Sequence, residues 1–329
     1  MVRWYENPAA RSWRTTAAPD EVLAFHQSLP SYRPTPLTAV PALASELGVG
    51  QVLVKDESQR LGLPAFKALG AWWAIHRAVR DHPGTTELVT ATDGNHGRAV
   101  ARRAAMLGLA AHVFVPDVVG EVAVEAIRSE GATVTVVADS YDAAVAEAAA
   151  YAAGDRLLIQ DSAWPGYEVI PRHIVDGYST LFREIEVRPE LVVVPMGVGS
   201  VAQAAVTHYR SGSAAPALLG VEPASASCIT TSLLADELVS VPTGATVMAG
   251  LNCGTPSSLA WPVLRSGLDY SVTVEDDAAL QAVDDLKAAG ISSGPSGAAT
   301  LAAVRAARDR LDLTTDSTVV LISTEAACG

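Results

Sequence analysis

Short apolar segments alternate with alanine-rich segments along most of this 329-residue chain. The apolar segments predict strands at 51–55, 88–91, 112–115, 133–137, 157–160, 191–195, 218–222 and 318–323. Between them apolar residues recur every three or four positions, which predicts helices at 66–80, 96–107, 141–153, 168–184, 201–209, 277–289 and 296–310. Because several of the strands are apolar throughout, we expect an α/β fold of parallel sheets covered by helices on both faces.

The alternation falls into two blocks, near residues 65–165 and 190–329, and the first 60 residues can pack on either. Open sheets of this kind bind their ligands beyond the carboxyl ends of the strands. The polar segments that follow predicted strands are therefore the places to look for function.

Charge and cysteine content narrow the function classes. The formal net charge of −13 disfavours binding to nucleic acid or to anionic membranes. We find no signal-peptide pattern and no apolar run of 18 residues, so we expect a cytoplasmic protein without a membrane span. Cys228, Cys253 and Cys328 form no C-x-x-C pair, so we expect no metal site and reduced thiols, with a Cys228–Cys253 pair left open.

Lys67 follows the segment 55–66, which ends a strand in a group of charged residues and leads into a predicted helix. A lysine in the first turn, between Phe66 and an apolar stretch, would lose water and face the positive end of the helix. Both effects favour the neutral amine, which is the form that attacks an aldehyde. A surface lysine whose stem covers Trp72 or Trp73 is the alternative.

The segment Thr92-Asp93-Gly94-Asn95-His96-Gly97 directly follows a strand and opens a helix. Its glycines let the backbone approach a ligand, and the helix start offers N–H groups to an anion such as a carboxylate. Asn95 can donate to a phenolate oxygen, and Asp93 can accept a proton. The alternative is a helix cap formed by Asp93 or Asn95, with His96 in a capping or core position.

Small residues at 197–200, Gly-Val-Gly-Ser, lie between the predicted strand 191–195 and the next helix, where N–H groups and a helix dipole can hold a phosphate. The segment also fits a loose dinucleotide fingerprint, with Ala202 in the place of the third glycine and Glu222 about 20 residues on.

Two further strand ends carry polar side chains. Asp161 follows the strand at 157–160 and can orient a substrate ammonium, although a turn aspartate is the simpler interpretation. Ser323 and Thr324 end the last strand, where a hydroxyl can pair with a ring nitrogen.

Taken in order, these segments resemble the fold-type II enzymes that depend on pyridoxal 5'-phosphate (PLP), the tryptophan-synthase β-like superfamily. The order is Lys-Asp-Glu-Ser at 55–58, Ala-Phe-Lys at 65–67, Thr-Asp-Gly-Asn-His-Gly at 92–97, Gly-Val-Gly-Ser at 197–200 and Ser-Thr-Glu at 323–325. Within the superfamily, Gln-Asp-Ser-Ala-Trp at 160–164 and Ala-Gly-Leu-Asn-Cys-Gly at 249–254 are similar to diaminopropionate ammonia-lyase.

The resemblance implies two open, mostly parallel, twisted sheets flanked by helices, with the cofactor in the cleft between two domains. We expect a large cofactor-binding domain of residues 1–64 and 166–329, a small domain of residues 65–165, and a homodimer.

The resemblance also implies the roles of single residues. The expected cofactor-binding residues are Lys67, which carries PLP as a Schiff base, with Asn95, Gly197, Val198, Gly199, Ser200, Ser323 and Thr324. The choice between Ser323 and Thr324 as partner of the pyridine nitrogen stays open. Lys67 and Asp93 are the expected catalytic residues, and Asp93, Gly94, His96 and Asp161 are the expected substrate-binding residues.

The reaction implied is the α,β-elimination of ammonia from D- or L-2,3-diaminopropionate, which yields pyruvate and two ammonia. Asp93 would serve the D isomer and Lys67 the L isomer. A serine/threonine dehydratase or a β-replacement synthase of the same fold is one alternative, and a non-catalytic protein that binds PLP or another metabolite is the other.

Overall fold

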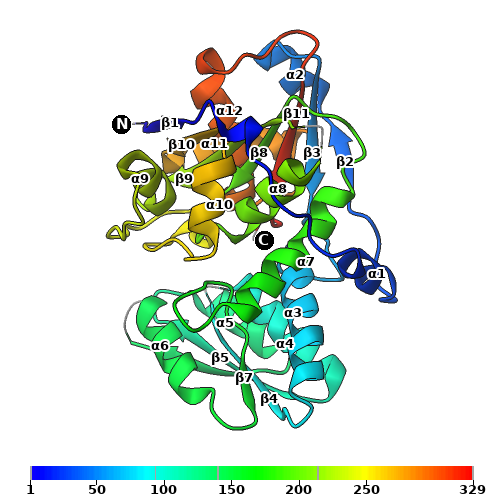
Figure 1. Cartoon of the computed structure of the whole chain (residues 1–329), viewed down its shortest axis with the longest axis vertical. Coiled ribbons are helices and arrows are strands. Elements are labelled where there is room, and N and C mark those ends of the chain that lie inside the picture. The colour runs from blue at the N-terminus through cyan, green and yellow to red at the C-terminus, as the bar shows by residue number, and fades with distance from the viewer. Residues whose placement is uncertain (1, 93, 139–140, 213–214, 328–329) are drawn as a thin grey trace.

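The computed structural model describes residues 2–92, 94–138, 141–212 and 215–327. These residues form two sheets, which lie in separate halves of the molecule (Figure 1). The predicted strands and helices are all present, with boundaries shifted by a few residues.

The larger sheet has seven strands in the order β1-β10-β9-β8-β11-β3-β2. They are β1 (Trp4–Glu6), β2 (Leu37–Ala39), β3 (Gln51–Asp56), β8 (Leu191–Pro195), β9 (Ala217–Pro223), β10 (Tyr270–Val274) and β11 (Thr318–Ser323). The interior pairs are parallel, while β1 and β2 are short antiparallel strands at the two edges. Every residue of β8 and β9 is buried, which explains why their sequences are apolar apart from Glu222.

The smaller sheet is parallel throughout, in the order β6-β5-β4-β7. Its strands are β4 (Glu87–Ala91), β5 (Ala110–Pro116), β6 (Thr133–Val137) and β7 (Arg156–Leu158). All four fall within the predicted small domain, and all other strands fall outside it. The first 60 residues, whose position the sequence left open, contribute β1, β2 and β3 to the larger sheet.

Twelve α-helices connect and cover the two sheets in the described parts of the chain. They are α1 (Glu21–Gln27), α2 (Pro41–Leu47), α3 (Lys67–Asp81), α4 (Asn95–Leu107), α5 (Glu121–Arg128), α6 (Tyr141–Tyr151), α7 (Val169–Arg183), α8 (Ser200–Ser211), α9 (Cys228–Ala235), α10 (Ala260–Gly267), α11 (Asp276–Ala288) and α12 (Pro295–Ala307). Within these residues no helix has the length and apolar character needed to cross a membrane.

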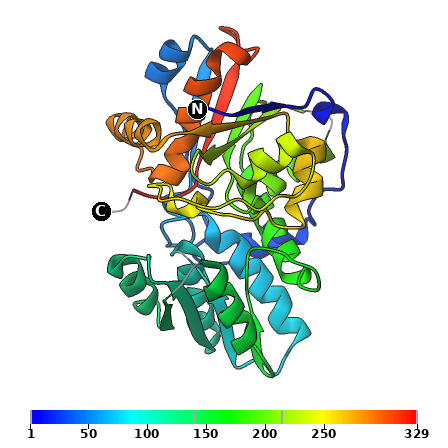
Figure 2. The same ribbon diagram turned by 90° about the vertical axis from the view of Figure 1, so that its left-hand side faces the viewer.

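Helices α3 and α7 lie at the boundary between the two halves, and α3 runs from there into the lower half (Figures 1 and 2). Two glycines let these helices approach closely. A Cβ atom on Gly70 would lie 2.5 Å from the Tyr178 ring, and one on Gly177 would lie 2.5 Å from the Leu69 carbonyl oxygen. The contact fixes the first turn of α3, and with it Lys67, against the middle of α7.

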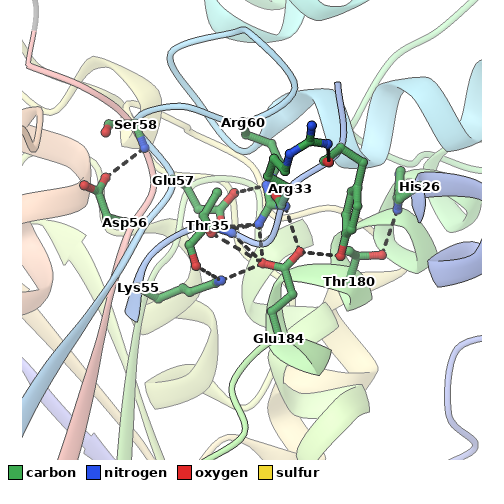
Figure 3. A network of polar contacts seen from close by, with 11 residues as sticks. His26, Arg33, Thr35, Lys55, Asp56, Glu57, Ser58, Arg60, Thr180 and Glu184 are labelled. Carbon is green, nitrogen blue, oxygen red and sulfur yellow. Dashed lines mark hydrogen bonds and ion pairs between the residues drawn. The ribbon is translucent and has the colours of Figure 1, made fainter. Parts of the chain in front are cut away.

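A buried network of ion pairs holds the segment that leads from β3 to α3 (Figure 3). Glu184, which follows α7, accepts hydrogen bonds from Lys55 Nζ at 2.6 Å and from Arg60 Nη2 at 2.7 Å. Arg60 also binds Glu57, and the Thr35 hydroxyl donates to Glu57. Lys55, Glu57 and Arg60 are fully buried, so each of their charges is compensated within the network.

Candidate active site

Lys67 is the first residue of α3, and its Nζ donates to Asp161 Oδ2 at 2.6 Å. The predicted position of this lysine is confirmed, but the predicted neutral amine is wrong for this structure. Burial alone would lower the pKa of Lys67, and the Asp161 carboxylate outweighs burial and raises the pKa above its usual value. Local sequence around Lys67 does not show this ion pair, because Asp161 lies 94 residues further along the chain.

Asp161 lies just beyond β7, on the segment that crosses from the small sheet toward the larger one. Burial opposes its ionisation, but the ammonium of Lys67 lowers the pKa of the Asp161 carboxyl to about 2. The Asp161 carbonyl accepts a hydrogen bond from Ser200 Oγ at 2.8 Å. Asp161 thus connects Lys67 to the glycine-rich loop that precedes α8.

That loop, residues 197–200, joins β8 to α8 as predicted. Gly199 has φ +100°, and a Cβ on it would meet Ala260 at 2.9 Å. A Cβ on Gly197 would lie 3.0 Å from the Gly250 carbonyl oxygen. Among the described residues no side chain caps α8, so its first N–H groups are free to bind a phosphate. The loop and the amine of Lys67 therefore fit a phosphate-bearing aldehyde such as PLP.

Glu222, the acidic residue of the loose dinucleotide fingerprint, has another partner. Its carboxylate accepts hydrogen bonds from the N–H groups of Ile229 and Thr230, at 2.9 and 2.7 Å, in the first turn of α9. It is fully buried, and burial raises its pKa to about 7. A glutamate held in this way cannot bind a ribose, which removes the support for a dinucleotide site.

Asn95 begins α4, and its Nδ2 donates to Glu325 Oε2 at 3.0 Å. Burial raises the pKa of the Glu325 carboxyl, while the Lys67 ammonium acts in the opposite direction. Glu325, which directly follows Ser323 and Thr324, was not predicted to be part of the site. The structure brings the end of the last strand against the start of α4.

Ser323 and Thr324 are both buried at the end of β11. Ser323 Oγ donates to Ser293 Oγ at 2.8 Å, and the backbone carbonyls of both residues accept hydrogen bonds from the segment 57–66. These bonds attach the start of α3 to β11. The choice between the two hydroxyls as partner of a ring nitrogen stays a prediction.

The remaining predicted substrate residues lie at the start of α4. Gly94 precedes the helix with φ +153°, and its N–H donates to Thr92 Oγ1. His96 is buried, which lowers its pKa, and its Nε2 lies 2.7 Å from the Ile159 carbonyl oxygen. Asp93 lies outside the described residues. The substrate-binding roles of Asp93, Gly94, His96 and Asp161 stay predictions.

Cysteines border the glycine loop. Cys228 and Cys253 form no disulfide bond with each other, and Cys228 Sγ donates to the Gly197 carbonyl at 3.8 Å. The possible pair left open by the sequence is therefore not formed in this structure. Within the described ranges, no group of three His, Cys, Asp or Glu side chains is placed to hold a metal ion.

Comparisons with known proteins agree with this geometry. The family model for the pyridoxal-phosphate dependent enzymes matches residues 29–325. The diaminopropionate ammonia-lyase of Escherichia coli K12 is 36% identical over 344 residues, which cover 92% of this chain and 86% of the relative. A biosynthetic L-threonine dehydratase of Mycobacterium leprae is 27% identical, over 89% of this chain and 68% of the relative.

Solved structures give the same result. A crystal structure of the E. coli diaminopropionate ammonia-lyase, in complex with an aminoacrylate–PLP azomethine reaction intermediate, superposes with a TM-score of 0.92 at 32% identity. The match covers 99% of this chain and 94% of that one. Maize serine racemase, at 22% identity and a TM-score of 0.80, shares the fold.

The chain belongs to the pyridoxal-phosphate dependent enzymes, and its two open, mostly parallel sheets are those of fold type II. Within that family, it is similar over most of its length to diaminopropionate ammonia-lyase. Its cofactor is pyridoxal phosphate, as predicted.

Proposed function

We propose that the protein eliminates one ammonia from 2,3-diaminopropionate, and that water hydrolyses the product of elimination to pyruvate and a second ammonia. The observation that carries the proposal is the partly buried pair of Lys67 Nζ and Asp161 Oδ2, 2.6 Å apart, in a chain 36% identical to an enzyme of that activity. When bound, PLP supplies an aldehyde that joins to an amine and a ring that stabilises negative charge on the neighbouring carbon.

Lysine content supports the assignment of Lys67 as the amine that joins the cofactor. The chain has three lysines, and all lie in the described residues. Lys55 is fully buried in ion pairs, and Lys287 is exposed on α11. Lys67 alone of the three pairs with Asp161, whose carbonyl binds Ser200 at the glycine loop.

Asp161 is the proposed partner of the substrate ammonium. The carboxylate already binds an ammonium, that of Lys67, and a substrate ammonium can take the same position. Transfer of Asp161 from one ammonium to the other would remove the main interaction that keeps Lys67 protonated. Lys67 Nζ then takes the Cα proton of the L isomer, and Asp93, as we propose, that of the D isomer.

The other predicted residues complete the site. The N–H groups of residues 197–200 hold the phosphate, and Asn95 faces the ring hydroxyl. We propose Ser323 or Thr324 as the partner of the ring nitrogen, because a hydroxyl leaves that nitrogen neutral and favours loss of a β-group over transamination. Gly94 and His96 are proposed to border the substrate.

The test is a substrate panel on purified protein supplied with PLP. D- and L-2,3-diaminopropionate are expected to give ammonia and pyruvate in a 2:1 ratio. Turnover of serine or threonine without turnover of diaminopropionate would instead identify a dehydratase, which the 27% identity to an L-threonine dehydratase supports as second candidate. Stable PLP binding without turnover of any of these would favour a non-catalytic protein.

We also propose a cytoplasmic homodimer, with residues 65–165 as the small domain and residues 1–64 and 166–329 as the large one. The lack of a disulfide between Cys228 and Cys253 supports a reducing compartment, and the division of strands between the two sheets supports the domain boundaries. Light scattering after size exclusion tests the dimer, since a single peak at the mass of one chain would contradict it.

A further inference from the structure

The segment that carries Asp161 starts where the edge strand β7 stops. β7 pairs with β4 as far as Leu158, opposite Val89, and the N–H of Ile159 adds one more hydrogen bond to the Val89 carbonyl. β4 continues to Ala91, so its last residues extend beyond the end of β7. The chain leaves the sheet at this point and crosses to Lys67.

The side chain of Gln160 takes the place of the missing strand. It is fully buried, and its Oε1 accepts hydrogen bonds from the Ala91 N–H at 3.0 Å and from Thr90 Oγ1 at 3.1 Å. Its Nε2 donates to Tyr141 Oη at 2.8 Å. The side-chain amide of Gln160 thus binds the Ala91 N–H, which a longer β7 would otherwise bind. The main chain after Ile159 can therefore turn away from the sheet.

Tyr167 fixes the same turn from the other side. Its hydroxyl accepts a hydrogen bond from the Gln160 N–H at 2.9 Å and donates to the Leu158 carbonyl at 2.8 Å. The ring stacks on Trp164, with 4.5 Å between the ring centroids. The hydroxyl therefore joins the two peptide groups on either side of Ile159, immediately before Asp161.

Beyond Asp161 the crossing segment is held by the other half of the molecule. The Asp161 carbonyl binds Ser200 Oγ, and the Ala163 N–H donates to Ser257 Oγ at 3.1 Å. With both ends fixed, the Asp161 carboxylate stays 2.6 Å from Lys67 Nζ. The strength of an ion pair falls with distance, so a small shift of this segment changes the pKa of Lys67.

We propose that Tyr167 and Gln160 are positioning residues, which hold Asp161 against Lys67 and so set the protonation of that amine. The catalytic importance of this positioning rests on the proposed function of Lys67. The effect of Tyr167 and Gln160 on the protonation of Lys67 does not depend on that function. Tyr167 and Gln160 act through Asp161 and need not touch the substrate.

The experiment measures the reactivity of each lysine in the full-length chain, freed of cofactor by hydroxylamine, toward acetic anhydride between pH 7 and 11. Mass spectrometry then reads the three lysines separately. In Tyr167→Phe we expect the acetylation of Lys67 at pH 9 to rise about tenfold, as for a pKa lowered by about one unit. Gln160→Met should act in the same direction, and Asp161→Asn should give the largest rise.

The chain supplies its own references. Lys287 is exposed on α11, so its acetylation measures the activity of the reagent at each pH. Lys55 is fully buried, so its acetylation measures the unfolded fraction, which is subtracted from the acetylation of Lys67. Tyr151→Phe is the matched control, because the Tyr151 hydroxyl binds Glu87 at the opposite end of β4, at 3.2 Å. It should leave the acetylation of Lys67 unchanged.

Lys67 reactivity within twofold of the parent in Tyr167→Phe and Gln160→Met would overturn the inference, whether or not Asp161→Asn is faster. The proposed function fails by a different observation, namely a parent protein that gains no mass when PLP and borohydride are added. The acetylation comparison stays valid in that case, so the two failures are distinguishable.

Discussion

Two lysines, Lys55 and Lys67, form ion pairs inside this molecule, and the burial and the partners of the two pairs differ. Lys55 is fully buried and has two acceptors, the Thr35 carbonyl at 2.8 Å and Glu184 at 2.6 Å, and Arg60 shares Glu184. The Lys67 side chain is 22% exposed, and its ion pair is with Asp161. The pair of Lys55 and Glu184 is enclosed in a network of other charges, whereas the pair of Lys67 and Asp161 lies in the candidate active site.

The two ion pairs differ in whether they can open. An ammonium in a closed network cannot exchange partners without leaving other buried charges uncompensated. The pair of Lys67 and Asp161 can open when a second ammonium arrives, because fewer groups depend on it. The same two chemical groups therefore serve structure in one place and are available for chemistry in the other.

The largest expected effect comes from Lys67→Arg, which keeps a cation beside Asp161 but removes the amine that attacks an aldehyde. We expect turnover to fall by at least ~10³-fold, by analogy with the loss of a positioned acid–base group. A steady-state assay measures the loss, and circular dichroism shows whether the fold is kept. Lys287→Arg is the control, and equal losses in both would contradict the role of Lys67.

Lys55→Met tests the closed network. One partner of a buried pair is lost while Glu184 stays buried, so we expect the free energy of unfolding to fall by about 3 kcal/mol. Urea denaturation measures this. The Michaelis constant of the folded fraction should stay within about twofold of the parent. Lys55→Met would thus lower stability and leave substrate binding unchanged, whereas Lys67→Arg would lower turnover and keep the fold. A stability equal to the parent's would show that the network contributes nothing.

The ion pair of Asp161 with Lys67 predicts how stability depends on pH. Its pKa falls from 3.8 in the unfolded chain to about 2 in the folded one, so its ionisation stabilises the fold above pH 4, and this contribution is lost as pH falls toward 2. The difference in unfolding free energy between the parent and Asp161→Asn should be constant from pH 5 to 7 and change by about 2 kcal/mol between pH 4 and 2. Urea titrations at each pH measure it, and a constant difference down to pH 2 would contradict the ion pair.

The smallest effect is expected from Tyr32→Phe. The Tyr32 hydroxyl donates to Glu184 Oε1 at 2.9 Å, and Glu184 keeps its bonds to Lys55 and Arg60 when that donor is lost. A loss of about 1 kcal/mol is expected, typical of one hydrogen bond. A loss as large as that of Lys55→Met would mean that the network depends on hydrogen bonds more than on charge.

The interior strands of both sheets, apart from β10, were predicted because their burial on two faces leaves mostly apolar segments. Strands β1 and β2, with three residues each, were missed because an edge strand of that length carries no period that a sequence pattern can show. β10 was also missed. Its partners β1 and β9 lie far from it in the sequence, and pairing with them decides its conformation.

The sequence predicted where the residues of the candidate site lie better than it predicted their charges and ion pairs. Lys67, Asn95 and the loop 197–200 follow strands or open helices, and local sequence shows this. The charge of Lys67 depends on Asp161, and the contact of Asn95 with Glu325 joins residues 230 positions apart. Those pairings follow from how the two sheets pack, which no local pattern describes.

The position of β3 in the larger sheet has a consequence for synthesis on the ribosome. Gln51 lies opposite Thr318, so β3 cannot complete its ladder until β11 has been translated. At about 5 to 20 residues per second, the nascent chain carries β3 without that neighbour for roughly 15 to 50 s. The four-stranded sheet, whose strands all lie between residues 87 and 158, can assemble during this interval. The half of the molecule that is translated in one piece is thus expected to fold before the half that encloses it in the sequence.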